Sequence, residues 1–407
     1  MTSCARNTRC PTFQILNKGQ WVSLNEQTKQ TNKSNKKVMS LAGTMLQNVR
    51  VKNPMLDKNE HRLSEYGAFN FFVQQSRMNP LLTSEMKEKA KASMGKTLQV
   101  PVIDYDGGIT ISNVRNCTIA DAENTSKFVG VTFATYAVGF TMVKAMYSNN
   151  EVDYQNDLAK KYLKCARVLG AALDSAALAA LGANKSKVFK DTLIYTKDTD
   201  TIVVPFTSRE DILSDIEPMM NANDFYGAVH IIGNAGVRSL LNKLAEKGAY
   251  NVVDKTMEWA GKYFHFTNRL TNDAGAYATF YAVEDGNVDI LFRYDREAAL
   301  GTQTKVGHDW DVVTMPYIDI PVGLHHYESV GDQSAIGGAA TTDLTCAVKE
   351  HFGFSVDVAF VVAYNSAPET RPNPIILTEI AGGDTYAAPV QVVNSTKNPI
   401  PTKAVTQ

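Results

Sequence analysis

The sequence predicts an α+β protein in which one lobe is inserted into another. A chain of 407 residues exceeds what a single hydrophobic core usually organises. A long helical pattern over residues 151–182 is flanked by strand-like patterns, and strand-like runs recur at 191–205 and 344–364. Between these two runs, residues 206–330 alternate strand and helix patterns. We therefore expect the chain to enter a first lobe, leave it for 206–330, and return.

The charge of the chain is balanced in total but divided unevenly along the sequence. Formal net charge is −1, yet residues 1–100 contain 16 Lys and Arg against 6 Asp and Glu. The remainder carries 25 against 36. This asymmetry predicts a basic arm that contacts either nucleic acid or the acidic body of another copy, with a solvated lysine-rich tail as the alternative.

Five scattered cysteines without a C-x-x-C pair indicate neither a disulfide framework nor a zinc knuckle, which fits a reducing compartment. The first residues contain no apolar run typical of a signal peptide, and no window looks long and apolar enough to span a bilayer. We expect a protein made and assembled in a cytoplasm.

Both ends of the chain are polar. Residues 1–40 are rich in Asn, Gln, Lys, Ser and Thr and predict an arm that is disordered until it meets a partner. Residues 381–407 predict a loose tail. The arm lysines are separated by small polar residues rather than by stacking aromatics, so we expect at most unspecific phosphate contacts. These lysines are Lys29, Lys33, Lys36 and Lys37.

Two short helices and a β-hairpin follow the arm. Helical spacing of apolar residues predicts one amphipathic helix over 60–78, and TSEMKEKAKASMG predicts a second, capped by Thr83 or Ser84 and ending at Gly95. KTLQVPVIDYDGGITISNVR alternates apolar and polar residues around Asp106-Gly107-Gly108, a hairpin signal, and a β-rich run follows at 126–143. A two-stranded ribbon is marginal in water, so we expect this one to lie on a neighbouring subunit.

The long helix is expected to begin at Asn149 or Asn150 and to end at Gly182, which makes a rod of roughly 45 Å. One stripe of it faces a core: Leu158, Tyr162, Cys165, Leu169, Leu173, Ala176 and Ala180. The other side starts with lysines and continues with small residues. These are Lys160, Lys161 and Lys164, then Gly170, Ala171, Ala177 and Ala179. We expect strands 191–205 and 344–364 to cover the small residues closely.

The inserted segment predicts a helix opened by Ser208 with Asp211 in capping-box position. Residues 226–248 read as strand, tight turn and helix, with Gly248 as the stop. Further strands are expected where apolar runs lie between N-D-A-G and E-D-G-N turns. Their ranges are 261–267, 276–283, 287–293 and 311–327.

No motif in the sequence requires catalysis, a metal or a cofactor. GNAG at 233–236 lies between a strand and a helix and reads as a tight turn, with a weak anion site as the alternative. His230 and His265 lie in apolar strands and are expected to be satisfied core or interface residues. His308, Asp309, Asp311, His325 and His326 could be imagined as metal ligands. The adjacent histidines should nevertheless point to opposite faces of a strand.

The order of these parts resembles the major capsid proteins of tailed bacteriophages, the Hong Kong 97-type fold shared with encapsulins, over about residues 45 to 380. The resemblance rests on the hairpin segment, on TFATYAVGFTMVKAMYSNNEVDYQNDLA leading into a helix that ends AALDSAALAALG, and on the inserted lobe. It implies the following division: arm 1–58, short helices 59–95, extended loop 96–148, peripheral domain with spine helix 149–205, axial domain 206–330, returning strands 331–380, and tail 381–407.

The resemblance also implies a role for specific residues. Extended-loop residues between subunits would be Lys96, Val102, Asp104, Tyr105, Gly107, Gly108, Ile109 and Arg115. Spine residues would be Leu158, Tyr162, Leu169, Gly170, Leu173 and Ala177. Some relatives crosslink this loop through Lys and Asn. Lys96 and Lys127 are the lysines near it here, and no partner Asn is identified, so a crosslink is not favoured.

The function implied is a shell of hexamers and pentamers, assembled in a bacterial cytoplasm and enclosing double-stranded DNA in a virion. Its interior surface would lie near the DNA without sequence preference. Further partners would be scaffolding, portal and decoration proteins. No membrane, cofactor or catalytic residue is implied. Two alternatives stay open, an encapsulin-like compartment and a soluble α/β nucleotide-binding enzyme that uses the GNAG turn.

Overall fold

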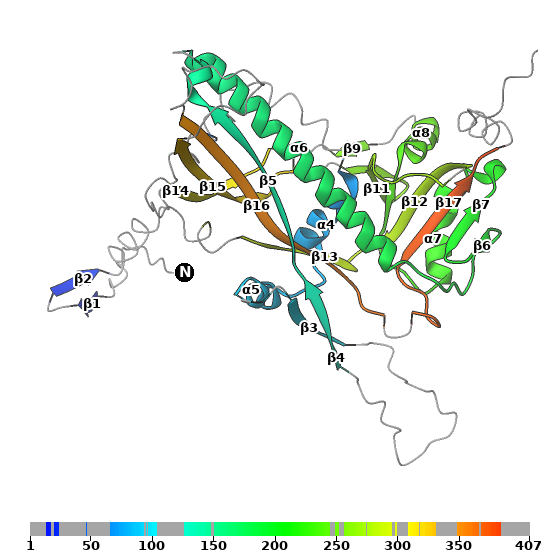
Figure 1. Ribbon diagram of the computed structural model, residues 1–407. Coiled ribbons are helices and arrows are strands. Elements are labelled where there is room, and N and C mark those ends of the chain that lie inside the picture. Colours follow the sequence, from blue (N-terminus) through cyan, green and yellow to red (C-terminus); the bar gives the residue numbers. More distant parts are fainter. Residues whose placement is uncertain are drawn as a thin grey trace, which may run out of the picture.

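The computed structural model describes two large sheets joined by one long helix (Figure 1). The described residues are 14–17, 20–23, 46, 66–92, 95, 97–103, 126–147, 150–244, 249–251, 256–273, 275–294, 298, 308–316, 318–330, 348–365 and 368–383. Within them the chain is α+β, as the sequence predicts.

The first sheet has five antiparallel strands built around one long strand. One edge of β16 (Val348–Val362) pairs with β5 (Ala134–Val143). The other edge pairs with β15 (Pro321–Val330) and then with β13 (Val288–Arg293), while β14 (His308–Thr314) pairs with β15. Burial alternates along β16, so one face of the sheet is buried and the other is partly exposed.

The second sheet has eight strands in the order β6-β7-β17-β12-β8-β11-β10-β9. Two pairs are parallel, β17 with β7 and β11 with β8, and the other pairs are antiparallel. Helices α7 (Ile212–Ala222) and α8 (Ala235–Leu244) share a buried core with it. The strands are β6 Thr196–Asp198, β7 Thr201–Val204, β8 Val229–Gly233, β9 Ala249–Asn251, β10 Thr256–Trp259, β11 Lys262–Phe266, β12 Ala276–Glu284 and β17 Ile375–Ala381.

Helix α6 (Glu151–Ala183) crosses the molecule and ends beside the eight-stranded sheet (Figure 1). Helix α4 (Gly67–Met78) packs between α6 and both sheets, and α5 (Ser84–Ala92) follows it. Three α4 phenylalanines are fully buried: Phe69, Phe71 and Phe72. One continuous apolar core therefore joins α4, α6 and residues of both sheets.

A two-stranded ribbon, β3 (Thr97–Ile103) with β4 (Ser126–Thr132), extends from the base of the five-stranded sheet (Figure 1). It forms a separate sheet, as does the short hairpin of β1 (Gln14–Asn17) and β2 (Gln20–Ser23). The partner of β3 is β4 rather than a strand directly after Asp106-Gly107-Gly108. That predicted turn and the segment after it lie outside the described residues.

Sheet membership corrects the expected boundaries of the inserted lobe. β13, β14 and β15 fall within 206–330, yet they pair with β16 in the five-stranded sheet. β6, β7 and β17 lie outside 206–330, yet they belong to the eight-stranded sheet. A strand pattern shows that a strand exists, whereas its sheet depends on partners far away in sequence.

Several expected helix ends also change. Asn150 caps α6 as predicted, since its side chain accepts a hydrogen bond from the Asp153 N–H, but the helix passes through Gly182 to Ala183. Thr83 caps α5, which ends at Ala92 before Gly95. Ser208 does not open α7. It belongs to a 3-10 turn, Phe206–Ser208, and Asp211 takes the N-cap position without a side-chain bond. Gly248 lies outside the described residues.

Among the described helices, α6 has the length and apolarity to cross a membrane, with a mean hydropathy of 1.4 over its most apolar window. The expectation that no window is so apolar is therefore wrong. Half of that window is buried inside the protein, and helices of a protein core pass the same test of length and apolarity.

Candidate functional site

The buried face of α6 holds every spine residue predicted from the sequence. Leu158, Tyr162, Leu169, Gly170, Leu173 and Ala177 are all buried. A Cβ added at Gly170 would lie 2.8 Å from Ile318 Cγ2 and 3.0 Å from Tyr66 Cζ, closer than side chains pack. Glycine therefore lets residue 66 and the segment before β15 approach the helix.

The layer that covers α6 includes β16, from the expected segment 344–364, but not the expected segment 191–205. β5, β16 and α4 pack on it, whereas residues 191–205 contribute β6 and β7 to the eight-stranded sheet. Ala179 is exposed and Ala171 is half-buried, so the small residues do not all face a cover. The lysines Lys160 and Lys164 lie on the exposed side, as expected.

Asp174 is a fully buried carboxylate in the middle of α6. It accepts hydrogen bonds from the backbone N–H of Phe69, at 3.0 Å, and from the hydroxyl of Thr267. Burial raises its pKa above the ordinary value, while these two hydrogen bonds and the nearby Arg269 oppose the rise. One side chain of α6 thus holds the first turn of α4 and the strand end after β11.

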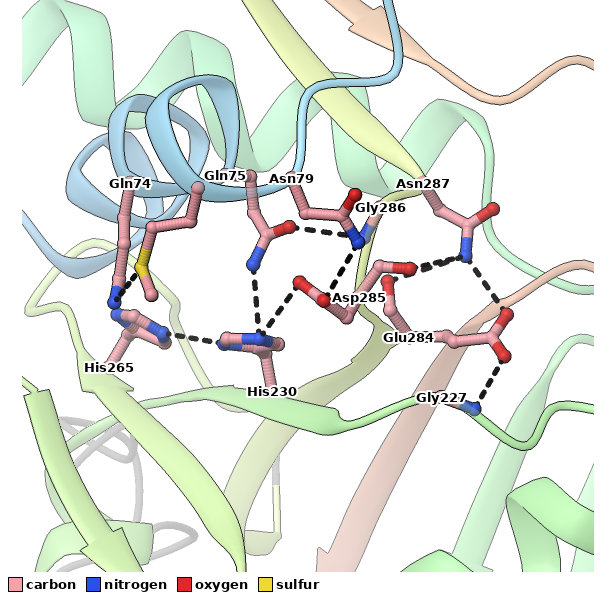
Figure 2. A network of polar contacts seen from close by, with 11 residues as sticks. Gln74, Gln75, Asn79, Gly227, His230, His265, Glu284, Asp285, Gly286 and Asn287 are labelled. Carbon is pink, nitrogen blue, oxygen red and sulfur yellow. Dashed lines mark hydrogen bonds and ion pairs between the residues drawn. The ribbon is translucent and has the colours of Figure 1, made fainter. Parts of the chain in front are cut away.

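A buried polar network joins the eight-stranded sheet to α4 (Figure 2). His230 of β8 lies at its centre: its Nε2 is 3.0 Å from Gln75 Nε2, and its Nδ1 is 3.2 Å from His265 Nε2. Asp285, in the turn between β12 and β13, accepts a hydrogen bond from Asn79 at 2.9 Å and lies 3.5 Å from His230. As predicted, both histidines are satisfied core residues.

The proton positions in this network follow from one backbone contact. The Gly286 N–H donates to Gln75 Oε1 at 3.1 Å, which directs the amide NH₂ of Gln75 toward His230 Nε2. His230 then carries its proton on Nδ1 and donates it to His265. Burial and the adjacent His230 place the pKa of His265 well below its usual range.

The base of the ribbon is fixed by Arg293 at the end of β13. Its guanidinium binds Asp357 of β16 through Nε, at 3.2 Å, and Nη2, at 3.0 Å, and donates to the Gly95 carbonyl through Nη1, at 2.8 Å. It also lies 4.7 Å from the ring centre of Phe133, the residue between β4 and β5. One side chain therefore contacts the segments that enter and leave the ribbon.

The same edge of the sheet anchors α5. Asp289 of β13 is fully buried, pairs with Lys87 at 2.8 Å and accepts a hydrogen bond from the Leu82 N–H at 2.9 Å. Arg293, Asp357 and Asp289 were not singled out from the sequence, because each is one charged residue in an ordinary strand pattern. Asp174 had a local signal that could have found it, a lone carboxylate in an apolar helical run.

The GNAG segment is a tight strand-to-helix turn, as predicted. Asn234 Oδ1 accepts hydrogen bonds from the backbone N–H groups of Gly236, at 3.0 Å, and Val237, at 3.4 Å. A Cβ at Gly236 would lie 2.5 Å from the Tyr277 carbonyl oxygen. The turn's own asparagine thus occupies N–H groups that an anion would need.

The adjacent histidines point to opposite faces of β15, as expected. The His325 ring stacks on Trp310, with ring centres 4.7 Å apart, whereas His326 packs on Phe352 on the buried face. His308 Nδ1 lies 3.0 Å from His325 Nε2. Within the residues that the structure describes, no three His, Cys, Asp or Glu side chains gather in a metal-binding group.

Of the predicted extended-loop residues, Val102 lies within the described part of the chain. Val102 pairs with Lys127 inside the ribbon. Lys96, Asp104, Tyr105, Gly107, Gly108, Ile109 and Arg115 lie outside the described residues, as do the arm residues Lys29, Lys33, Lys36 and Lys37.

Comparison with known proteins gives similarities of structure alone. A solved structure from Mycobacterium phage Bobi has a TM-score of 0.41 and 12% identity, covering 76% of this chain and 91% of that one. The capsid structure of cyanophage P-SCSP1u has a TM-score of 0.38 and 11% identity, covering 72% and 84%. The capsid of the native GTA particle has a TM-score of 0.38 and 13% identity, covering 74% and 92%. No family model and no curated protein matches the chain.

Proposed function

We propose that the chain is a major capsid protein of the Hong Kong 97 type, which builds the shell of a tailed bacteriophage around double-stranded DNA. In this proposal α6 is the spine, the five-stranded sheet belongs to the peripheral domain, and the eight-stranded sheet forms the axial domain. Hexamers and pentamers of the chain would close the shell, and its role would be structural rather than catalytic.

The ribbon is the observation that carries this proposal. β3 and β4 pair with each other, and among the described strands neither joins a larger sheet. A two-stranded ribbon is marginally stable in water unless something packs on it. Arg293 fixes its base on the body, so it is an extension held at one end that a second copy would complete.

The open edge of β5 supports the same conclusion. This strand pairs with β16 on one side and has no described strand on the other. An unpaired strand edge is a template for pairing with another chain, and proteins usually cover it. In a closed shell, contacts of this kind are multiplied by symmetry, so each can be weak.

Negative-stain microscopy of the purified protein tests the proposal directly. We expect closed particles from the wild type and folded subunits without particles after deletion of residues 103–112. Deletion of ten residues from the C-terminal tail, 398–407, is the control of equal length and should leave the particles intact. A wild-type chain that stays monomeric at high concentration would overturn the proposal.

An encapsulin-like compartment is the second candidate, because the same ribbon and spine would serve it. The content of the particles separates the two. Nuclease-protected DNA in particles from infected cells indicates a virion, and a co-purifying enzyme indicates a compartment.

A further inference from the structure

The exposed side of α6 carries a group of cations with no carboxylate among them. Between residues 158 and 173 the helix contains four basic residues and no acidic one. Lys160, Lys164 and Arg167 are exposed and follow each other at helical spacing, so they lie on one side of the helix. We call these three residues the basic face.

Among the residues that the structure describes, the carboxylates on the neighbouring turns of α6 have partners or point elsewhere. Asp157 pairs with Lys161 at 3.2 Å and accepts a hydrogen bond from Tyr147. Asp174 is buried and faces α4. In the part of the chain that the structure describes, Lys160 and Lys164 form no ion pair. Lysines of the eight-stranded-sheet region do form them: Lys185 with Asp200, Lys187 with Glu369, and Lys190 with Asp224.

A hollow of about 410 Å³ lies on the Lys161 side of the helix, where Lys161 is paired with Asp157 and Lys349 is a second cation. Lys161, Lys349, His351 and Thr141 are among the residues that line it. Burial and the charge of Lys349 lower the pKa of His351, so this ring is a neutral neighbour of two cations. The remainder of the chain after residue 100 is acidic, which makes this local excess of positive charge distinctive.

We propose that the basic face binds the phosphates of double-stranded DNA without sequence preference. This inference rests on the proposed function and assigns the shell's DNA contact to the spine helix. Lysine and arginine that neutralise phosphates give unspecific, salt-dependent affinity. The three side chains lie about 4.5–6 Å apart along the helix axis at ~1.5 Å per residue, and their long stems can reach neighbouring phosphates of one strand.

Another copy of the chain is the competing occupant, since its body is acidic. The composition of the basic face argues against it. Lysine is depleted in protein–protein interfaces, whereas it is a usual binder of phosphate. Two of the three residues are lysines.

The test is fluorescence anisotropy of a labelled 24-base-pair duplex of mixed sequence, titrated with full-length protein between 50 and 200 mM NaCl. Protein concentrations stay below those at which sedimentation detects particles. The variant is Lys160→Gln, Lys164→Gln and Arg167→Gln together, because glutamine keeps helix propensity close to that of lysine. Three lost phosphate contacts should reduce the slope of log K against log salt by about 2.7. Over this salt range the wild-type affinity should then fall about 40-fold more than that of the variant.

The matched control replaces Lys185, Lys187 and Lys190 with glutamine, which removes the same charge from ion-paired positions. An unchanged slope in this control, together with a shallower slope in the first variant, supports the inference. Equal slopes in the wild type and both variants overturn it. Lost assembly with an unchanged DNA slope also overturns it and assigns the basic face to a contact between copies. If the wild type forms no particles but the slope falls as expected, the DNA contact stands and the capsid proposal fails.

Discussion

The carboxylate of Asp174 in α6 accepts a hydrogen bond from the backbone N–H of Phe69 in α4, at 3.0 Å. This contact joins two helices that are far apart in the sequence. Because the N–H groups of a first helical turn lack partners inside the helix, a carboxylate from a neighbouring helix is a suitable acceptor for them. Its cost is the burial of a charge, which the raised pKa of Asp174 reflects.

Asp174→Ala should lower the free energy of unfolding by about 1–3 kcal/mol, because it leaves the Phe69 N–H and the Thr267 hydroxyl unpaired. Asp174→Asn keeps an acceptor for Phe69 and a donor for Thr267 without a charge, so it should fold as well as the wild type near pH 7. Chemical denaturation of both variants is the measurement. Equal destabilisation by Asn and Ala would show that the charge itself is required.

The same residue predicts a pH dependence of defined sign. A carboxyl with a raised folded-state pKa binds a proton more tightly in the folded chain, so its effect on stability becomes less favourable as pH rises from about 4. Relative to Asp174→Asn, the wild type should lose unfolding free energy between pH 4 and neutrality. A difference that stays constant with pH would contradict the raised pKa.

Gly170 should tolerate no larger side chain. Phenylalanine there would overpack the contacts with Ile318 and Tyr66 and cost about 1–3 kcal/mol or more. Ala172→Phe is the matched control, since that position is exposed on the same helix. Thermal melting should separate the two variants, and an unchanged melting temperature for Gly170→Phe would mean that the helix is not covered there. Ala177→Phe, also at a buried position, should behave like Gly170→Phe.

Arg293→Lys should loosen the ribbon at its base, because an ammonium group cannot make the two-atom contact with Asp357 and also reach the Gly95 carbonyl. Hydrogen exchange in β3 and β4 should rise about 10-fold or more, as expected for the loss of hydrogen bonds to a charged group. Arg209→Lys, in the other lobe, is the control and should leave ribbon exchange unchanged. Equal hydrogen exchange of β3 and β4 in both variants would show that Arg293 does not hold the base of the ribbon.

His265 predicts acid sensitivity of the junction between the lobes. Its pKa is held well below 6.5 by burial and by His230, so the folded chain keeps it neutral while the unfolded chain takes up a proton below about pH 6.5. Stability is therefore complete above that pH and falls below it, by up to about 1.4 kcal/mol per pH unit. Denaturation from pH 7 to 5 should show this slope, and His265→Gln should reduce it.

His351→Gln is the comparison for that measurement. The pKa of His351 is also lowered by burial, but its ring is only partly buried, so its replacement should reduce the slope less than that of His265. If both variants reduce the slope of stability against pH equally, the buried pair of His230 and His265 is not the acid-sensitive element.

Local patterns in the sequence predict the α+β class, the long helix α6, the buried stripe of that helix and the position of most strands. These features have local causes. Apolar residues repeat at the helical period from Leu158 to Leu173, Asn150 caps the helix start, and turns at Gly275 and Gly286 separate strands. The GNAG turn could also be predicted, because a strand pattern, a glycine and an apolar helical pattern follow each other directly.

Which strands share a sheet and which charged residues pair depends on the tertiary structure. β13 to β15 join β16 rather than the strands around β8, and Arg293 reaches Asp357, because these pairings depend on the packing of segments far apart in the chain. Local patterns fix the period and burial of an element, whereas the partner of a backbone edge or of a buried charge is set by the whole core. For that reason the elements of this protein could be predicted from its sequence, and the boundary between its lobes could not.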